Sequence, residues 1–419
     1  MCSHRVAFNF ATLSFGKSLK NGLTVGLTQC YKIREWLTLA VYDSPQNLHF
    51  MKKKRIFTCT PKPFCGDDVF FARDTGLICR TLQSLGVESN AILLLPRQQN
   101  DYADVLRTTL ENLESVEWWK ELNLDGVVLY SWGMRQYNRI ARAIHKAGIR
   151  LVVHMDTSGN FDKLLPEDYT PLKAVKKWIT SSLNNILRSR HLSYADVITM
   201  APPVAERVSR MTFMDKSIVE KNYPMPGPVS PMCRYNGEEK KDIILCIGRW
   251  ADNNQKRQFM LMETLAIYYA TGGTAETRIY GKITNELREW HASLPLMTAD
   301  RVKLLGFVEN RKLWSEYAMS KVILCCSRYE GSHCVSSEAL CCGCSVVVCN
   351  RPEPLRVVHW YTSKNSGTIS QEDTADSLAQ ALHHELELWE KGERNPHAIA
   401  EVWQPHFHAD LVLKGIFQL

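Results

Sequence analysis

Short apolar runs alternate along the chain with longer segments in which apolar residues recur at helical spacing. In the first half, this pattern predicts helices and strands in alternation. The helices are predicted over 70–85, 106–122 and 137–146, and the strands over 55–60, 89–95, 125–130, 150–154 and 196–200. Such alternation indicates right-handed crossovers and a mainly parallel sheet covered on both faces. The first half is therefore predicted to be a doubly wound α/β domain.

The alternation breaks at residues 222–231, where four prolines occur in ten residues. Such a segment can continue neither a helix nor a central strand, so it predicts a linker between two domains. A second α/β unit follows. Its strands are predicted over 242–247, 276–280, 302–305, 321–326 and 345–349, and its helices include 256–270, 336–342 and 376–390.

The predicted organisation has four parts. Residues 1–50 show no sustained period and are interpreted as an N-terminal extension, with an added structured element as the alternative. Residues 51–225 form a first domain and residues 226–400 a second. Residues 401–419 are a C-terminal segment that could pack back on the first domain.

The bulk composition is that of a globular protein, with 45% hydrophobic and 23% charged residues. A net charge of +7 is too weak to indicate nucleic-acid binding, but it suits an anionic substrate or membrane surface. No apolar stretch is long enough to predict a spanning helix, and no signal peptide is evident. We therefore expect a cytoplasmic protein, with the inner face of a membrane as a further possible location.

Fourteen cysteines are unusual, and most of them lie in apolar runs. We expect them to pack as small buried hydrophobes in a reducing compartment. The cluster Cys341, Cys342 and Cys344, with His333 nearby, matches no zinc-ligand spacing, so we predict no metal site there.

The segment 172–190 has the pattern of a basic amphipathic helix, with Trp178 among its lysines. Such a helix can lie on an anionic bilayer. The alternative, which we prefer from the sequence, is a helix packed on its own sheet.

Candidate chemistry centres on the loop after the predicted strand 321–326. Ligands of parallel sheets bind beyond the carboxyl ends of strands, and a helix N-terminus suits a phosphate. Gly331 lets the backbone approach a ligand closely. Glu330 on the loop and Glu338 in the helix supply carboxylates that can accept hydrogen bonds from paired hydroxyls.

Five segments in order resemble the second domain of retaining GT-B glycosyltransferases. They resemble the large paired-glutamate family of bacterial mannosyl-, glucosyl- and galactosyltransferases, of the glycosyltransferase family 4 type. The segments are Ile244 to Arg249 with Lys256, Arg278 to Gly281, Val302 to Val308, Glu330 to Glu338, and Ala339 to Val346.

This resemblance implies two Rossmann-like domains facing across a cleft, with the nucleotide-sugar held by the second domain and the acceptor by the first. It implies that Glu330 is catalytic, that Glu338 binds the ribose, and that Phe307 and Val308 line the base pocket. The donor diphosphate is expected to contact Arg249, Lys256, Gly331, Ser332, His333 and Cys334.

Two departures from the family pattern stand out. Ser332-His333 replaces the usual Phe-Gly pair, and Lys256 lies seven positions after Arg249, where five is commoner. Arg257 is therefore the alternative to Lys256 as the phosphate-binding cation.

In the first domain, His154 ends a predicted strand and resembles the family's histidine that faces the donor sugar. The alternative is a core histidine. Asp67 and Asp68 follow the first strand, where acceptor contacts are expected, and Trp132 follows another strand.

The predicted reaction moves a sugar from a nucleotide-sugar, by default a UDP-sugar, to a hydroxyl of a carbohydrate or lipid-linked acceptor in surface polysaccharide or glycolipid synthesis. No spaced aspartate pair follows a strand, so we expect metal-independent transfer without a cofactor. The alternatives are a non-catalytic binding protein that kept this fold and a phosphorylase or synthase.

Overall fold

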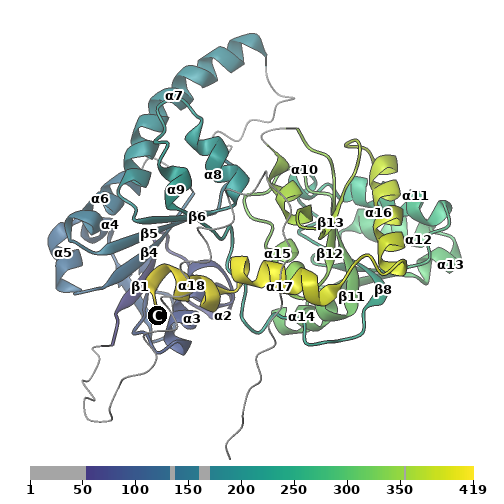
Figure 1. Ribbon diagram of the computed structural model, residues 1–419, viewed down its shortest axis with the longest axis horizontal. Helices are drawn as coiled ribbons and strands as arrows, with labels where there is room; N and C mark the ends of the chain where they lie inside the picture. The colour runs from purple at the N-terminus through teal and green to yellow at the C-terminus, as the bar shows by residue number, and fades with distance from the viewer. Residues whose placement is uncertain (1–52, 133–136, 160–169, 353–354) are drawn as a thin grey trace, which may run out of the picture. The chain divides into compact units, whose positions relative to one another are not determined.

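The computed structural model describes residues 53–132, 137–159, 170–352 and 355–419 (Figure 1). The predicted extension at 1–50 lies outside these residues. Residues Lys53–Leu419 form one compact unit that contains two β-sheets.

The first sheet has seven strands in the order β3-β2-β1-β4-β5-β6-β7, and every pairing is parallel. The strands are β1 (Ile56–Thr60), β2 (Ala91–Leu94), β3 (Val105–Thr108), β4 (Gly126–Ser131), β5 (Arg150–Met155), β6 (Val197–Met200) and β7 (Asn222–Pro224). The central strands β1 and β4 are buried along their whole length, as expected for a parallel sheet covered on both faces.

Short and long helices connect these strands. They are α2 (Asp68–Phe71), α3 (Asp74–Ser84), α4 (Leu110–Glu114), α5 (Val116–Glu121), α6 (Asn138–Lys146), α7 (Pro171–Ser193), α8 (Pro202–Ser209) and α9 (Ile218–Lys221). The predicted helix 70–85 is divided because Arg73 is extended and Asp74 has a positive φ of 50°.

One prediction was wrong and one strand was not predicted at the edges of this sheet. The predicted helix 106–122 begins instead with strand β3, which pairs with β2, and Thr109 then caps α4. The proline-rich segment 222–231 begins with β7, which pairs with β6. Proline is tolerated in an edge strand because one side of that strand needs no ladder donor.

The second sheet has six parallel strands in the order β10-β9-β8-β11-β12-β13. The strands are β8 (Lys241–Ile247), β9 (Glu276–Tyr280), β10 (Val302–Gly306), β11 (Ser320–Cys325), β12 (Ser345–Val348) and β13 (Gly367–Ile369). The helices are α10 (Asn253–Lys256), α11 (Gln258–Ala270), α12 (Asn285–Ser293), α13 (Leu296–Ala299), α14 (Asn310–Met319), α15 (Cys334–Cys341), η3 (Arg356–Thr362), α16 (Ala375–Glu390), α17 (Pro396–Phe407) and α18 (Ala409–Phe417).

The last two helices divide between the two domains (Figure 1). Trp403 and Phe407 of α17 belong to the core of the second domain. Ile416 and Phe417 of α18 instead pack with Ile56 of β1 in the first domain. The C-terminal segment therefore returns to the first domain from α18 onward.

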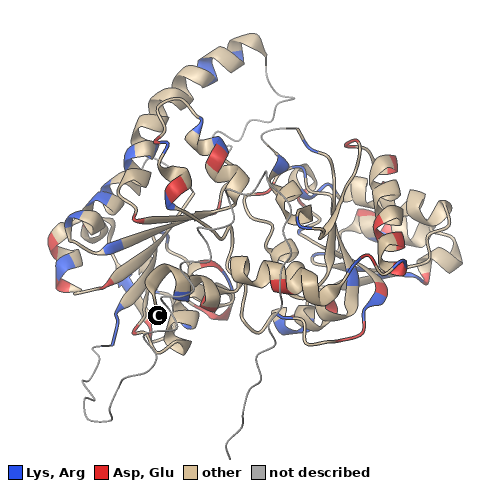
Figure 2. Cartoon of the chain, viewed as in Figure 1, with Lys and Arg blue, Asp and Glu red and all other residues tan. Residues whose placement is uncertain are grey.

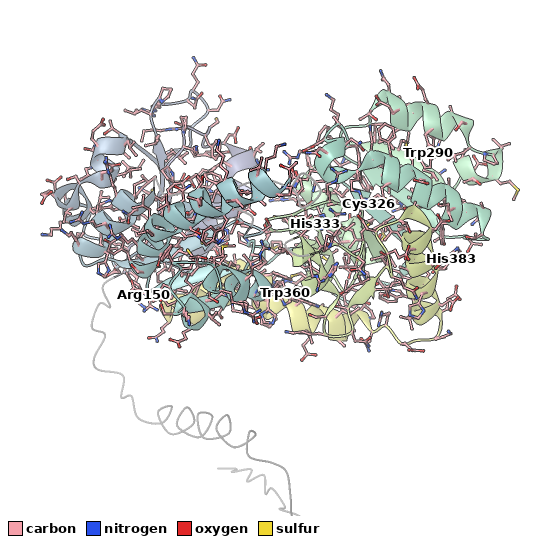
Figure 3. All side chains as sticks on the ribbon, turned by 90° about the horizontal axis from the view of Figure 1, so that it is seen from above. Arg150, Trp290, Cys326, His333, Trp360 and His383 are labelled. Carbon is pink, nitrogen blue, oxygen red and sulfur yellow. The ribbon has the colours of Figure 1, made fainter. Side chains whose placement is uncertain are left out.

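The two cores also meet at η3. Trp360, labelled in Figure 3, packs against buried residues of both domains. Its neighbour Val357 is itself part of the first-domain core, which α8 helps to build. This contact joins the second domain to the first near the carboxyl end of the first sheet.

Ten of the twelve cysteines in the described residues are buried and all twelve are free, in line with the expected packing role. Within the described residues, no helix is long and apolar enough to cross a membrane.

Candidate functional site

The loop 326–333 joins β11 to α15 at the carboxyl edge of the second sheet. Parallel sheets bind ligands at this edge. Gly331 lies against the first domain, since a Cβ atom added to it would stand 2.5 Å from Oδ1 of Asp156. A larger residue would have to displace the Asp156 side chain, so the loop and the residues after β5 are in direct contact there.

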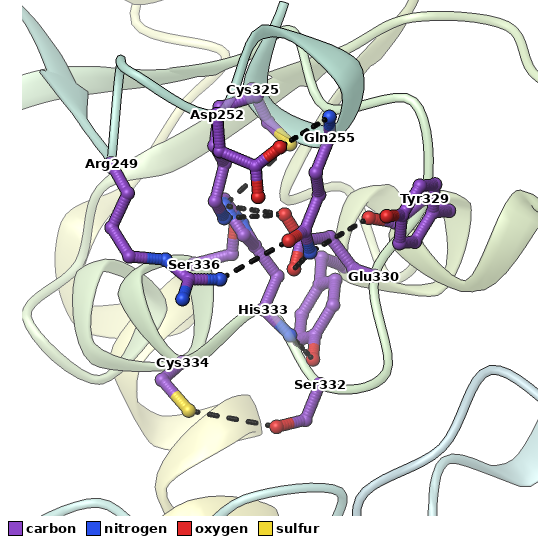
Figure 4. Close-up of polar contacts among 12 residues, drawn as sticks. Arg249, Asp252, Gln255, Cys325, Tyr329, Glu330, Ser332, His333, Cys334 and Ser336 are labelled. Atoms are coloured by element: carbon purple, nitrogen blue, oxygen red, sulfur yellow. Dashed lines mark hydrogen bonds and ion pairs between the residues drawn. The ribbon is translucent and has the colours of Figure 1, made fainter.

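Glu330 is buried on this loop, and Lys256 and Gln255 are among its side-chain partners (Figure 4). The Lys256 Nζ atom donates to its Oε1 at 2.5 Å, and the Gln255 Nε2 atom donates to its Oε2 at 3.2 Å. Burial alone would raise the pKa of Glu330, but the Lys256 ammonium holds that pKa below its usual value. The Glu330 carboxylate is therefore ionised although it is buried.

Gln255 also links Arg249 to this group. Its Oε1 atom accepts a hydrogen bond of 3.2 Å from Nη2 of the exposed Arg249. Arg249 follows β8, while Gln255 and Lys256 lie on the short helix α10, which Asp252 caps. The backbone N–H of Arg328 donates to the Gln255 carbonyl at 2.8 Å, which ties α10 to the Glu330 loop.

The two candidate cations next to each other in sequence separate in space. Arg257 has a positive φ of 54° and donates to Oδ1 of Asp373 at 2.6 Å. Lys256, by contrast, reaches Glu330. Of the two, Lys256 stands in the group with Arg249.

His333 is buried behind the loop. Its Nδ1 atom lies 2.6 Å from Oγ of Ser336, and its backbone N–H donates to the Tyr361 hydroxyl at 3.1 Å. Burial lowers the pKa of His333 to about 4, so the ring is neutral at pH 7. It braces the start of α15 and offers a diphosphate no positive charge.

Ser332 and Cys334 flank His333 and are both partly exposed. Their Oγ and Sγ atoms lie 3.5 Å apart. Burial raises the pKa of the Cys334 thiol, so that group stays neutral.

Glu338 lies one turn into α15 and points to a different partner from Glu330. The hydroxyl of Tyr317 on α14 donates to its Oε2 at 2.8 Å. Burial raises the pKa of Glu338 to about 7, and the Tyr317 hydrogen bond partly offsets this effect. The two glutamates are thus electrostatically different.

A cavity of about 660 Å³ opens at the ends of β9 and β10. The exposed Phe307 lines it together with Gly281 and Gly306. Val308 is not among the lining residues and packs against the core of the second domain. Such a cavity, with an aromatic ring at its rim, has room for a nucleobase.

In the first domain, His154 lies within β5 and is fully buried. Its Nδ1 atom is 2.7 Å from Oγ1 of Thr199, and its Nε2 atom has no hydrogen-bond partner among the described residues. Burial lowers the pKa of His154 to about 4. From the resemblance, the ring is expected to face the donor sugar, with a core histidine as the alternative. The ring is buried, and a catalytic role for it stays a prediction.

Asp156, two positions further along and directly after β5, meets the second domain. It accepts hydrogen bonds from the Tyr130 hydroxyl at 3.1 Å and from the backbone N–H of Ser332. Burial and the nearby Asp74 raise the pKa of Asp156 to about 6. A carboxyl group that titrates near neutrality at a domain contact is a candidate functional group.

A smaller, mostly apolar cavity of about 270 Å³ lies beside β1. Its polar lining residues include Asp67, Arg73, Asp74 and Tyr130. Asp67 also caps α2 by accepting from two backbone N–H groups at 3.1 Å. The cavity connects the predicted acceptor loop with Tyr130, the partner of Asp156.

The other two predicted acceptor residues point elsewhere. Asp68 accepts a hydrogen bond of 2.5 Å from the Tyr102 hydroxyl, and it does not line the cavity. The ring of Trp132 packs edge-on against Tyr130 at 4.6 Å, with Lys62 Nζ 5.6 Å from its centre.

Within the described ranges, His, Cys, Asp and Glu side chains form no group of three or more that could hold a metal ion.

Comparison with known proteins follows this geometry. Residues 241–387 match the family model described as Glycosyl transferases group 1. This segment, which contains the second sheet, is similar to the domain that the model describes. The matched segment includes Arg249, Lys256, Glu330 and Glu338. The comparison with curated proteins gives no match.

Several solved structures share the fold. A glycosyltransferase from Rickettsia africae has a TM-score of 0.59 at 14% identity, covering 88% of this chain and 97% of its own. HepE from Anabaena, in complex with UDP, has a TM-score of 0.57 at 14% identity, covering 87% and 98%. The lipopolysaccharide outer core galactosyltransferase WaaB, in its apo form, has a TM-score of 0.55 at 14% identity, covering 87% and 99%. The fold is therefore GT-B, and with the matched domain it makes the protein a transferase of the glycosyltransferase class.

Sequence reasoning missed Gln255, Asp156 and Tyr130 as members of the site. Asp156 carried a usable signal, because it lies two positions after His154 at the end of a predicted strand. Tyr130 ends an apolar run in the same way. Gln255 offered no signal beyond its place before Lys256.

Proposed function

We propose that this glycosyltransferase is a retaining, metal-independent enzyme that moves a sugar from a UDP-sugar to a hydroxyl of its acceptor. The observation that carries the proposal is the buried Glu330 carboxylate held by Lys256 and Gln255, with Arg249 bonded to Gln255 beside it. Retention is supported by the resemblance of the Glu330 to Glu338 segment to the paired-glutamate motif. The UDP donor is supported by the UDP in the HepE structure.

The chemistry needs positive charge where the diphosphate leaves. Breaking the sugar–phosphate bond places an extra negative charge on the diphosphate, and Arg249 and Lys256 are cations beside the loop. Arg249 offers a planar fork to phosphate oxygens, and Lys256 offers a compact charge. Donors aimed in advance at developing charge supply the largest part of many rate enhancements. In this scheme no metal is required, and a diphosphate oxygen takes the acceptor proton as the bond breaks.

Glu330 positions the Lys256 ammonium. Because its carboxylate is ionised and paired with Lys256, it holds the ammonium at the carboxyl edge of the sheet. Its remaining acceptor capacity suits a sugar hydroxyl. Glu338, with its pKa near 7, is then left to accept hydrogen bonds from the ribose.

The test is UDP release from a panel of UDP-sugars by the purified full chain, with and without a chelator and with simple alcohols as acceptors. We expect release that the chelator leaves unchanged, and a product of retained anomeric configuration by NMR. Glu330→Gln keeps the shape of the side chain but loses its charge, and should lower the rate about 100-fold. Glu289→Gln, an exposed glutamate on α12, is the matched control.

Other outcomes would contradict the proposal. If no nucleotide is released from any donor although UDP binds, the protein is a non-catalytic binder with this fold. If inorganic phosphate replaces the alcohol as the productive acceptor, it is a phosphorylase. Full activity of Glu330→Gln would mean that the sugar is placed elsewhere.

A further inference from the structure

The helix α7 presents its apolar side chains to solvent. Leu172 is 86% exposed, and Trp178 and Leu183 are each 62% exposed. The exposed set on this helix is Leu172, Val175, Trp178, Ile179, Leu183 and Ile186. The sequence predicted that such residues would pack on the sheet, and the structure shows that they do not.

The side of α7 that faces the protein is mostly polar. Ser182, Asn185, Arg188 and His191 are buried, and Leu192 near the end of the helix is buried in the first-domain core. Asn185 donates to the carbonyl of Thr212 at 3.1 Å and accepts from Nη1 of Arg188, on the same helix, at 2.9 Å. The helix is thus held by polar contacts and by Leu192, while the exposed set of apolar side chains lies outside the first-domain core.

Six exposed apolar residues on one helix are more than the scattered hydrophobic residues of an ordinary surface. Groups of this kind mark a surface that binds a partner.

Charge on α7 is of one sign. The helix contains no Asp or Glu, and its basic residues are Lys173, Lys176, Lys177, Arg188 and Arg190. Lys173 and Lys176 are exposed among the apolar side chains, and Figure 2 shows lysine and arginine along the helix. An apolar surface bordered by lysines, with tryptophan within it, fits a partner that is apolar inside and anionic at its surface.

We propose that α7 lies on the surface of an anionic lipid bilayer. Leu172, Ile179 and Leu183 insert into the boundary of the acyl chains, and Lys173 and Lys176 contact lipid headgroups. The helix lies in the plane of the surface, since it is not apolar enough to cross a bilayer. Each lysine near an anionic surface should strengthen partitioning about fivefold, and each buried CH2 group about fourfold.

This surface belongs to the first domain, which also contains the apolar cavity beside β1. If the proposed function holds, docking brings the acceptor domain to a surface where a lipid-linked acceptor resides. Docking itself needs no catalysis. Vesicle binding can therefore fail while transfer to soluble acceptors succeeds, and transfer can fail while vesicle binding succeeds.

The experiment is co-sedimentation of the full chain with vesicles. One set contains phosphatidylcholine alone, and the other contains phosphatidylcholine with about a third phosphatidylglycerol, a composition chosen to give a strong surface potential. We expect partitioning onto the anionic set to be at least tenfold stronger, and to weaken as salt is raised. Equal binding to both sets, or no binding to either, would overturn the proposal.

Three double variants locate the contact. Ile179→Ser with Leu183→Ser should lower partitioning at least tenfold, and Lys173→Gln with Lys176→Gln should lower it roughly 20-fold on the anionic set. Leu296→Ser with Met297→Ser is the matched control, because these residues of α13 are 79% and 77% exposed in the second domain. Unchanged UDP binding and melting temperature would show that each variant is folded.

A second copy of the chain is the competing occupant. Light scattering over a range of concentrations measures it without lipid. A dimer that is lost in Ile179→Ser with Leu183→Ser, without lipid binding in the parent chain, would assign the surface to self-association and overturn the bilayer proposal. Equal loss of vesicle binding in the α13 control would do the same.

Discussion

The carboxylates on the two sides of the domain contact are in opposite electrostatic states. Glu330 in the second domain is paired with Lys256, and its pKa is held below the usual value. Asp156 in the first domain lies near Asp74, and its pKa is raised to about 6. Both are largely withdrawn from water, so the difference comes from the neighbouring charge. The second domain has a cation that suits an anionic ligand, whereas the first domain has a carboxyl group, Asp156, that can gain or lose a proton.

Of the changes that test this comparison, removal of the Lys256 cation should have the largest effect on the transfer rate. Lys256→Ala deletes a phosphate-binding charge and leaves Glu330 buried without its ion pair, so the transfer rate should fall about 100- to 1000-fold. Single-turnover UDP release measures it, and Lys303→Ala, an exposed lysine on β10, is the control. A loss below tenfold would mean that Lys256 serves the fold alone.

Asp156→Asn tests the carboxyl group on the first-domain side of the contact. Ionised Asp156 can accept a hydrogen bond from an acceptor hydroxyl, so transfer should rise with pH through about 6 and should be about tenfold slower in the variant. The stability of the folded protein should depend on pH in the opposite direction to the transfer rate. A carboxyl whose pKa is raised in the folded state stabilises the fold at low pH and loses that contribution as pH rises through 6.

The variant should therefore melt at a higher temperature than the parent at pH 7.5, while being slower. Thermal melts and rates at pH 5, 6 and 7.5 give both readouts. A variant that is slower and less stable at pH 7.5 would indicate a structural role instead.

Glu338→Gln sharpens the contrast between the two glutamates of one motif. Because the pKa of Glu338 is raised to about 7, its carboxylate is only partly ionised at neutral pH. UDP affinity should rise with pH through this range, and the variant should bind roughly fivefold more weakly at pH 8, where one charged acceptor for the ribose is lost. Calorimetry on both proteins over the same pH range cancels the titration of UDP itself. Identical slopes would refute the ribose assignment.

His154→Gln should have the smallest effect, and it decides between the two interpretations of this residue. With a folded pKa of about 4, His154 stabilises the protein fully above its unfolded value near 6.5. That contribution is lost as pH falls toward 4, because the unfolded chain binds a proton that the folded protein refuses. Urea titrations at pH 7 and pH 5 should differ less in the variant. A 100-fold loss of rate with unchanged stability would instead support the catalytic assignment.

The sequence missed edge strands in both sheets. In the second sheet it did not predict β13, although Arg249, Lys256, Glu330 and Glu338 lie in recognisable order in that domain. In the first sheet it did not predict β3 and β7, the two edges. Edge strands are short and only half-buried, so their apolar pattern is weak and their pairing depends on the neighbouring strand.

The sequence by itself determined the two parallel sheets and the position of the Glu330 loop, because buried parallel strands need continuous apolar runs and glycine marks a close approach of the backbone. Only the tertiary structure decided which side chains share a site. It turned Lys256 to Glu330 and Arg257 to Asp373, brought Asp156 after β5 against Gly331, and left the apolar side of α7 exposed. Periodicity shows that a helix has an apolar side, but which side faces the protein depends on the partners that the rest of the chain supplies.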